Sequence, residues 1–112
     1  MSQNALNRLL RIIYTNMSVA IGESLKEVIL YGSYARGDYD EESDIDIALI
    51  VDMERSEAEK LLRSLMNFAS DFCLENDIVI SLNCIPEEDF NRYKAVMPYY
   101  RNINEEGVRL SA

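Results

Sequence analysis

The segment from Leu30 to Ile47 contains residue types whose spacing suits phosphate and metal chemistry. Gly32 and Ser33 follow a short apolar run and precede an expected helix start. At a helix start the backbone N–H groups have no partner within the helix, and they point outward with the positive end of the helix dipole. Glycine lets an anion approach the backbone closely, and the serine hydroxyl can cap the helix or bind a phosphate oxygen. Taken alone, the pair also fits an ordinary strand-to-helix turn.

Asp44 and Asp46 lie two residues apart on an expected strand. Their carboxylates therefore share one face of that strand. Two like charges side by side repel each other unless a cation lies between them, and Mg²⁺ prefers carboxylates together with substrate phosphates. An Asp-x-Asp pattern is common, however. A turn residue followed by an exposed strand acid would give the same pattern.

The combination of the two features is more informative than either one. Ten residues, Tyr34 to Ser43, separate the glycine–serine pair from the acidic pair. Adjacent strands would bring phosphate donors to face metal-holding acids, as phosphoryl or nucleotidyl transfer requires. Arg36 adds a cation to the same loop that could reach a phosphate. Its alternative role is a surface salt bridge to Asp38 or Asp40.

The elements that must position these residues are predicted from hydrophobic spacing, together with turn residues and a capping-box pattern at Ser56. In chain order they are a helix over Asn4 to Glu23, a strand over Glu27 to Tyr31, a turn with a short helix and loop over Ser33 to Ser43, a strand over Asp44 to Val51, a helix capped by Ser56, a strand over Asp77 to Ile85, and one or two helices over Glu87 to Leu110. This order predicts an α/β (α+β) fold, with helices packed on a small mixed sheet.

Length and composition narrow the function classes. The 112 residues suit one domain, 1–112, with a motif core at about 25–85 and a helical tail at about 87–110. The net charge of −9 would repel nucleic-acid phosphates, so direct DNA or RNA binding is not expected. No histidine is present, which leaves carboxylates for metal binding. We expect Cys73 and Cys84 to be reduced, buried thiols, with a disulfide or a metal role as the alternative.

The hydropathy pattern indicates where the chain resides. The longest apolar runs, Val28 to Tyr31 and Ile45 to Val51, are too short to span a bilayer. The first residues are polar and no signal-type apolar stretch follows them. We therefore expect a cytoplasmic location without membrane association.

The run from Gly32 to Gly37 (Gly-Ser-Tyr-Ala-Arg-Gly), followed by Ser43 to Ile47 (Ser-Asp-Ile-Asp-Ile), resembles the signature of the DNA polymerase β-like nucleotidyltransferase superfamily. It looks most like the minimal, MNT-type branch. Many members of that branch are antitoxins that transfer AMP from ATP to a tyrosine of a HEPN-domain toxin and so silence its RNase activity. The resemblance implies the polymerase β-like nucleotidyltransferase fold, ATP as substrate, Mg²⁺ as cofactor and a HEPN-type partner.

Carried over to this chain, the resemblance implies that Gly32 and Ser33 hold the triphosphate and that Asp44 and Asp46 ligate Mg²⁺. The superfamily usually has a third carboxylate on a neighbouring strand, which helps to bind the catalytic metal and can act as a base. On the expected strand over residues 77–85, the polar face offers Asp77, Ser81 and Asn83.

Asp77 is the one acid on that face, so it is the candidate third metal ligand and catalytic residue. It lies at the beginning of the expected strand rather than at its centre. The alternative is that the third position falls at Ser81. The base would then be missing, and Asp77 would be a turn residue that opens the strand.

Three functions stay open at this point. The first is a protein AMP-transferase that acts as an antitoxin, which the acidic charge and the short chain favour. The second is a nucleotidyltransferase that modifies a small molecule, such as an antibiotic hydroxyl. The third is a binding module that neutralises a partner sterically, without catalysis. The sequence leaves open the nucleotide, the acceptor and whether the chain forms a homo-oligomer.

Overall fold

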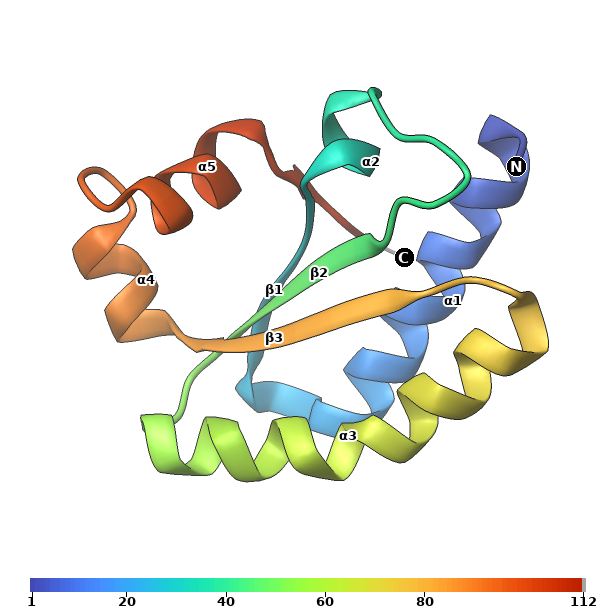
Figure 1. Cartoon of the computed structure of the whole chain (residues 1–112). Helices are drawn as coiled ribbons and strands as arrows, with labels where there is room; N and C mark the ends of the chain where they lie inside the picture. Colours follow the sequence, from blue (N-terminus) through green and yellow to red (C-terminus); the bar gives the residue numbers. More distant parts are fainter. Residues whose placement is uncertain (112) are drawn as a thin grey trace.

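The computed structural model describes residues 1–111 and shows a four-stranded mixed sheet with helices on both faces (Figure 1). The elements are α1 (Gln3–Ile21), a 3₁₀ turn η1 (Gly22–Ser24), β1 (Leu25–Tyr31), α2 (Ser33–Arg36), β2 (Ile45–Val51), α3 (Arg55–Asn76), β3 (Ile80–Pro86), α4 (Glu87–Tyr93), α5 (Pro98–Glu106) and β4 (Val108–Arg109). Across the sheet the strand order is β3-β2-β1-β4. The predicted fold class is confirmed.

Strand β2 is the centre of the fold because both of its faces are buried. One face carries alternate residues from Ile45 to Val51 and packs against α1 and α3. The other face carries Ala48 and Ile50, which pack with Phe90 of α4 and Ile103 of α5. This second cluster does not extend to the amino-terminal end of β2. The part of the sheet face near Asp46 is therefore less covered.

The pairing of β2 differs on its two sides. β1 runs antiparallel to β2, whereas β3 runs parallel to it across the α3 crossover. β1 therefore ends, and β3 begins, beside the amino-terminal end of β2. The α2 turn and the acidic segment before β2 come together at this edge of the sheet (Figure 1).

The predicted start of the third strand at Asp77 was wrong. Helix α3 continues to Asn76, and Asp77 follows it as the C-cap with φ 51° and ψ 50°. The N–H groups of Asp77 and Ile78 both donate to the carbonyl of Cys73, so they close the helix instead of pairing with β2. The predicted cap at Ser56 was also wrong, because α3 begins at Arg55 and Glu54 takes the N-cap position.

The prediction of a helical tail to Leu110 was wrong at its end. Helix α5 stops at Glu106, and Val108 and Arg109 form β4, which pairs with Leu30 and Ile29 of β1. The Arg109 guanidinium donates to the backbone and side-chain oxygens of Asn104, at 2.8 Å each. The tail is thereby fixed against the sheet edge.

Both cysteines are free, as expected, but they are partly buried rather than fully buried. Burial raises the pKa of the Cys84 thiol to about 11, so it stays protonated at neutral pH. The Cys73 sulfur accepts the N–H of Ile80 at 3.3 Å, which satisfies a donor at the start of β3. No helix in residues 1–111 is both long enough and apolar enough to cross a membrane.

Candidate functional site

The turn between β1 and α2 is in contact with the acidic strand. Gly32 takes the N-cap position of α2 with φ 75° and ψ −154°, a conformation that favours glycine. Any Cβ at this position would collide with the Asp46 carboxylate, whose Cγ would be only 3.3 Å away. Because Gly32 is the N-cap, the Ser33 hydroxyl does not cap the helix. The backbone N–H groups of Ser33 and Tyr34 begin the helix and have no carbonyl partner within it.

Hydrogen bonds order the loop that leads to the acidic pair. The Asp40 carboxylate accepts the Glu42 N–H at 2.9 Å and the Ser43 hydroxyl at 3.2 Å. The Ser43 oxygen in turn accepts the Asp40 N–H at 3.0 Å. Asp44 follows this closed loop and is exposed, and Asp46 is the second residue of β2. The predicted proximity of turn and acids is thus present, although Asp44 lies just before the strand.

The electrostatics of Asp46 fit a cation site. Its partial burial raises the pKa of Asp46, the negative charge of Asp44 adds to the rise, and the positive charge of Arg36 opposes it. Arg36 itself bonds to Asp38 at 3.2 Å and to Glu106 of α5 at 3.4 Å. A cation beside the two aspartates would relieve both their repulsion and the incomplete hydration of Asp46.

The neighbours of Asp46 across the sheet are Tyr31 on β1 and Ser81 on β3. Directly paired residues of adjacent strands present their side chains on the same face. Ser81 therefore lies on the same face of the sheet as Asp46, one strand away. Asp77 lies four positions earlier, outside the strand. Within residues 1–111, no three Asp, Glu, Cys or His side chains are clustered closely enough to hold a metal ion.

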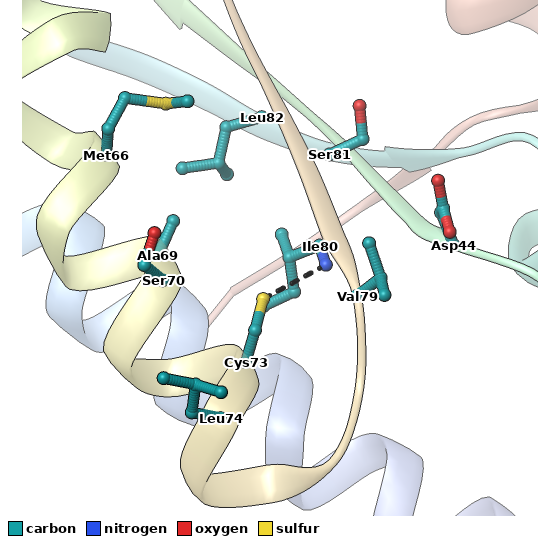
Figure 2. A pocket seen from close by; sticks show the side chains of 10 residues that line it. All are labelled: Asp44, Met66, Ala69, Ser70, Cys73, Leu74, Val79, Ile80, Ser81 and Leu82. Carbon is teal, nitrogen blue, oxygen red and sulfur yellow. Dashed lines mark hydrogen bonds between the residues drawn. The ribbon is translucent and has the colours of Figure 1, made fainter.

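A cavity of about 620 Å³ opens between α3 and β3 beside this edge of the sheet. Figure 2 shows Asp44 and Ser81 on one side of β3, and Met66, Cys73 and Leu74 of α3 on the other. A second cavity, of about 1000 Å³, is lined by the motif loop and by Asp77. Asp77 thus lines the second cavity together with the motif loop, and it does not line the first cavity, which Asp44 and Ser81 border.

Two aromatic arrangements flank the site. Tyr34 and Tyr39, both in the motif loop, stack with their ring centroids 4.1 Å apart. Tyr31 meets Tyr99 of α5 edge-to-face, with their hydroxyl oxygens 3.1 Å apart. The Asn83 side-chain amide donates to the Tyr99 oxygen at 2.6 Å. Burial, followed by the bond to Tyr99, raises the pKa of Tyr31 well above its ordinary value.

Sequence reasoning did not connect Tyr31, Asn83 and Tyr99. The tyrosines are 68 positions apart, and Asn83 contributes from a third element. The alternation along β3 did place Asn83 on the polar face with Ser81, and that was the only local signal. The packing of α5 over the sheet supplies the third member of the group.

A glycine turn in contact with an acidic strand, on a mixed sheet of this topology, defines a site of the nucleotidyl-transfer type. The model of the nucleotidyltransferase domain family matches residues 19–109, and the chain belongs to this family. The resemblance carried by the Gly32-to-Ile47 motif is confirmed at this level.

Two proteins of Methanocaldococcus jannaschii are similar in sequence. The putative protein adenylyltransferase MJ0604 is 41% identical over 87 residues, which cover 74% of this chain and 75% of that protein. The putative protein adenylyltransferase MJ0141 is 44% identical over 66 residues, which cover 59% of this chain and 65% of that protein.

Solved structures with the same fold come from toxin–antitoxin complexes. A chain of a toxin–antitoxin complex with AMP-PNP superimposes with a TM-score of 0.53 at 20% identity, over 100% of this chain and 74% of that one. A chain of a mutant MntA–HpeT complex gives 0.51 at 17% identity, over the same shares of the two chains. At these identities the likeness shows a common fold.

Proposed function

We propose that this protein transfers AMP from ATP to a tyrosine hydroxyl of a partner protein, and that it acts as the antitoxin of a HEPN-type toxin. The observation that carries the proposal is the contact between Gly32 and the Asp46 carboxylate. It joins the phosphate turn and the acidic pair into one site. The protein adenylyltransferase names of the two relatives, and a neighbouring structure of a tri-AMPylated Shewanella oneidensis HEPN toxin with an MNT antitoxin, support this acceptor class.

In this proposal the backbone at Gly32 and Ser33 holds the triphosphate, since N–H groups at a helix start favour anions. Asp44 and Asp46 hold Mg²⁺, for which oxygen ligands of high negative charge are suited. When bound, Mg²⁺ would neutralise phosphate charge as pyrophosphate leaves. Arg36 would help by exchanging an exposed carboxylate partner for a phosphate oxygen. Such exposed ion pairs are weak, so breaking one of them to bind a phosphate oxygen costs little free energy.

The acceptor hydroxyl would approach over the sheet face near Ser81, where the side chain is small and exposed. Its oxygen forms a bond to the α-phosphorus, and the bond from that phosphorus to the α,β-bridging oxygen breaks. Pyrophosphate leaves with the electron pair, and the hydroxyl proton passes to water. We assign two carboxylates to the metal site. Asp77 could join them as a third ligand only if the segment after α3 moved, because the α3 C-cap holds it outside β3.

Incubation with α-phosphate-labelled ATP, Mg²⁺ and the HEPN-type product of a neighbouring gene tests the proposal. We expect label on a tyrosine of that partner and none with the Asp44→Asn/Asp46→Asn double variant. Asp71→Asn, an exposed acid on α3, is the matched control and should leave labelling unchanged. A partner that is never labelled would refute AMP transfer. Full neutralisation of the toxin by the double variant would instead indicate steric inhibition.

A further inference from the structure

The sheet face beside the acidic pair carries a row of polar side chains. Tyr31 lies directly opposite Asp46 on one side, and Ser81 lies beside it on the other. Asn83 follows Ser81 by two residues, so it shares the same face of β3. This row extends from the metal-binding position toward α5.

Tyr99, in the first turn of α5, places a hydroxyl group over this row. Its oxygen lies 3.1 Å from the Tyr31 hydroxyl and 2.6 Å from the Asn83 amide nitrogen. Tyr31 is paired with Asp46, and Asn83 follows Ser81, the other partner of Asp46, by two residues, so the Tyr99 oxygen lies over the sheet face that carries the Asp46 carboxylate. A nucleotide held by Asp46 and the Gly32 turn would extend over this face of the sheet.

We propose that Tyr99 is an internal acceptor, and that the protein transfers AMP from ATP to its own Tyr99 hydroxyl. The inference rests on the proposed nucleotidyl transfer. The Tyr99 oxygen forms a bond to the α-phosphorus, and the bond between that phosphorus and the bridging oxygen breaks. Pyrophosphate leaves with the electron pair. The hydroxyl proton passes to water, which reaches Tyr99 because 45% of this residue is exposed.

Other tyrosines near the site are less suitable acceptors. Tyr31 is part of a strand and its ring packs against the cluster around Ile29, so it cannot turn toward a nucleotide. Tyr34 and Tyr39 stack on each other in the motif loop. Tyr99 alone among these four combines an exposed ring with a hydroxyl held on the Asp46 face of the sheet.

Self-modification would affect the transfer to a partner. AMP on Tyr99 would lie on the same sheet face that a partner's tyrosine must approach. A chain modified at Tyr99 should therefore label a partner more slowly than an unmodified chain does. The reaction would be self-limiting when ATP is abundant and the partner is absent.

The test uses the full chain with α-phosphate-labelled ATP and Mg²⁺, and with no other protein. We expect up to one AMP per chain, in the peptide that contains Tyr99, with release of an equal amount of pyrophosphate. Tyr99→Phe should lose at least nine-tenths of the label. Tyr14→Phe, on α1 and away from the site, should label like the unchanged protein.

Mixing Asp46→Asn with Tyr99→Phe distinguishes transfer within a chain from transfer between chains. The unmixed wild type must first be labelled at Tyr99. Transfer within a chain then leaves both variants in the mixture unlabelled, whereas transfer between chains labels Asp46→Asn at Tyr99. Either result is consistent with Tyr99 as the acceptor. Label on another residue, or label on a partner with none on Tyr99, overturns this inference and leaves the proposed function intact. Absence of label from both the chain and the partner overturns both.

Discussion

The contact between Gly32 and the Asp46 carboxylate is the most specific feature of the site at the scale of single residues. Gly22 provides a comparison, because its φ and ψ of 75° and −144° nearly match the 75° and −154° of Gly32. A Cβ on Gly22 would meet nothing within 4 Å, whereas a Cβ on Gly32 would collide with Asp46. Alanine substitutions at the two glycines therefore distinguish the effect of backbone strain from the effect of the collision with Asp46.

We predict that Gly22→Ala lowers the free energy of unfolding by about 1–3 kcal/mol through backbone strain alone. Gly32→Ala should lower it by more and should also abolish ATP binding, because Asp46 must move. Urea denaturation and calorimetric titration with ATP would measure the two effects. Loss of ATP binding in Gly22→Ala as well would show that the effect is not local to the turn.

Asp46 should also make stability depend on pH. Its folded-state pKa is raised, so the folded state binds its proton more tightly than the unfolded chain does. The contribution of Asp46 to the free energy of unfolding therefore falls as the pH rises from the ordinary carboxyl range to the raised value, and it is level above that.

Asp46→Asn is accordingly expected to be more stable than the unchanged protein at about pH 7, with the difference disappearing near pH 3 to 4. Thermal denaturation across this range measures it, and Asp71→Asn controls for removal of an acidic charge in general. Mg²⁺ should stabilise the unchanged protein and not Asp46→Asn. Equal stability of the two proteins at every pH would contradict the assigned burial effect.

Ser81 lies beside Asp46 on the same face of the sheet. We predict that Ser81→Asp raises the rate of AMP transfer by about tenfold or more, because it supplies a base and a further metal ligand. Ser70→Asp adds the same charge on the α3 wall of the neighbouring cavity and should have no such effect. Asp77→Asn should leave the rate unchanged. A large loss in Asp77→Asn would show that Asp77 reaches the metal after all.

At the scale of elements, sequence spacing predicted α1, β1 and β2 because their apolar residues recur at helical or strand spacing. The short α2 was predicted from the glycines and acidic residues of its segment. The ends of α3 and β3 were not predictable in the same way. The alternation of apolar and polar residues is consistent with a strand that starts at Asp77. Only the left-handed conformation of Asp77, as the cap of α3, excludes this residue from β3. β4 has two residues and no alternation, and it forms because the outer edge of β1 offers unpaired backbone groups.

In the candidate site too, some features follow from local sequence spacing and others depend on tertiary packing. The glycine–serine pair and the aspartates are close in sequence, so their spacing was sufficient to predict that the turn and the acidic strand lie near each other. Tyr99 joins them through the packing of Ile103 and Phe90 between α5, α4 and the sheet, which no local pattern encodes. The position of Ser81 beside Asp46 likewise depends on the register of a parallel pair.

Gly107 determines how α5 connects to β4. A Cβ at Gly107 would collide with the Ile103 carbonyl and the Ile29 side chain. We predict that Gly107→Ala lowers the free energy of unfolding by about 1–3 kcal/mol, as overpacking commonly does. Urea denaturation would measure it, with Asn102→Ala on the exposed side of α5 as control. An unchanged midpoint would indicate that β4 contributes little to the fold.

At the scale of the whole molecule, the net charge of −9 should govern the rate at which the protein associates with a charged partner. Association with a basic partner should slow at least tenfold between about 0.01 M and 1 M salt, as the screening length falls from about 30 Å to about 3 Å. Stopped-flow mixing would measure the association rate. A rate independent of salt would argue for an apolar encounter surface instead.

Strand β4 and helix α5 have a consequence for the order in which the protein is made. The motif turn and both aspartates leave the ribosome well before Tyr99, Glu106 and the β4 residues that pair with β1. A nascent chain that stops short of α5 would thus carry the acidic pair and an Arg36 without its Glu106 partner, on a sheet that lacks one edge strand. The complete site can therefore assemble only after α5 and β4 have been synthesised, and truncations that remove these two elements should affect nucleotide chemistry even though the motif itself is intact.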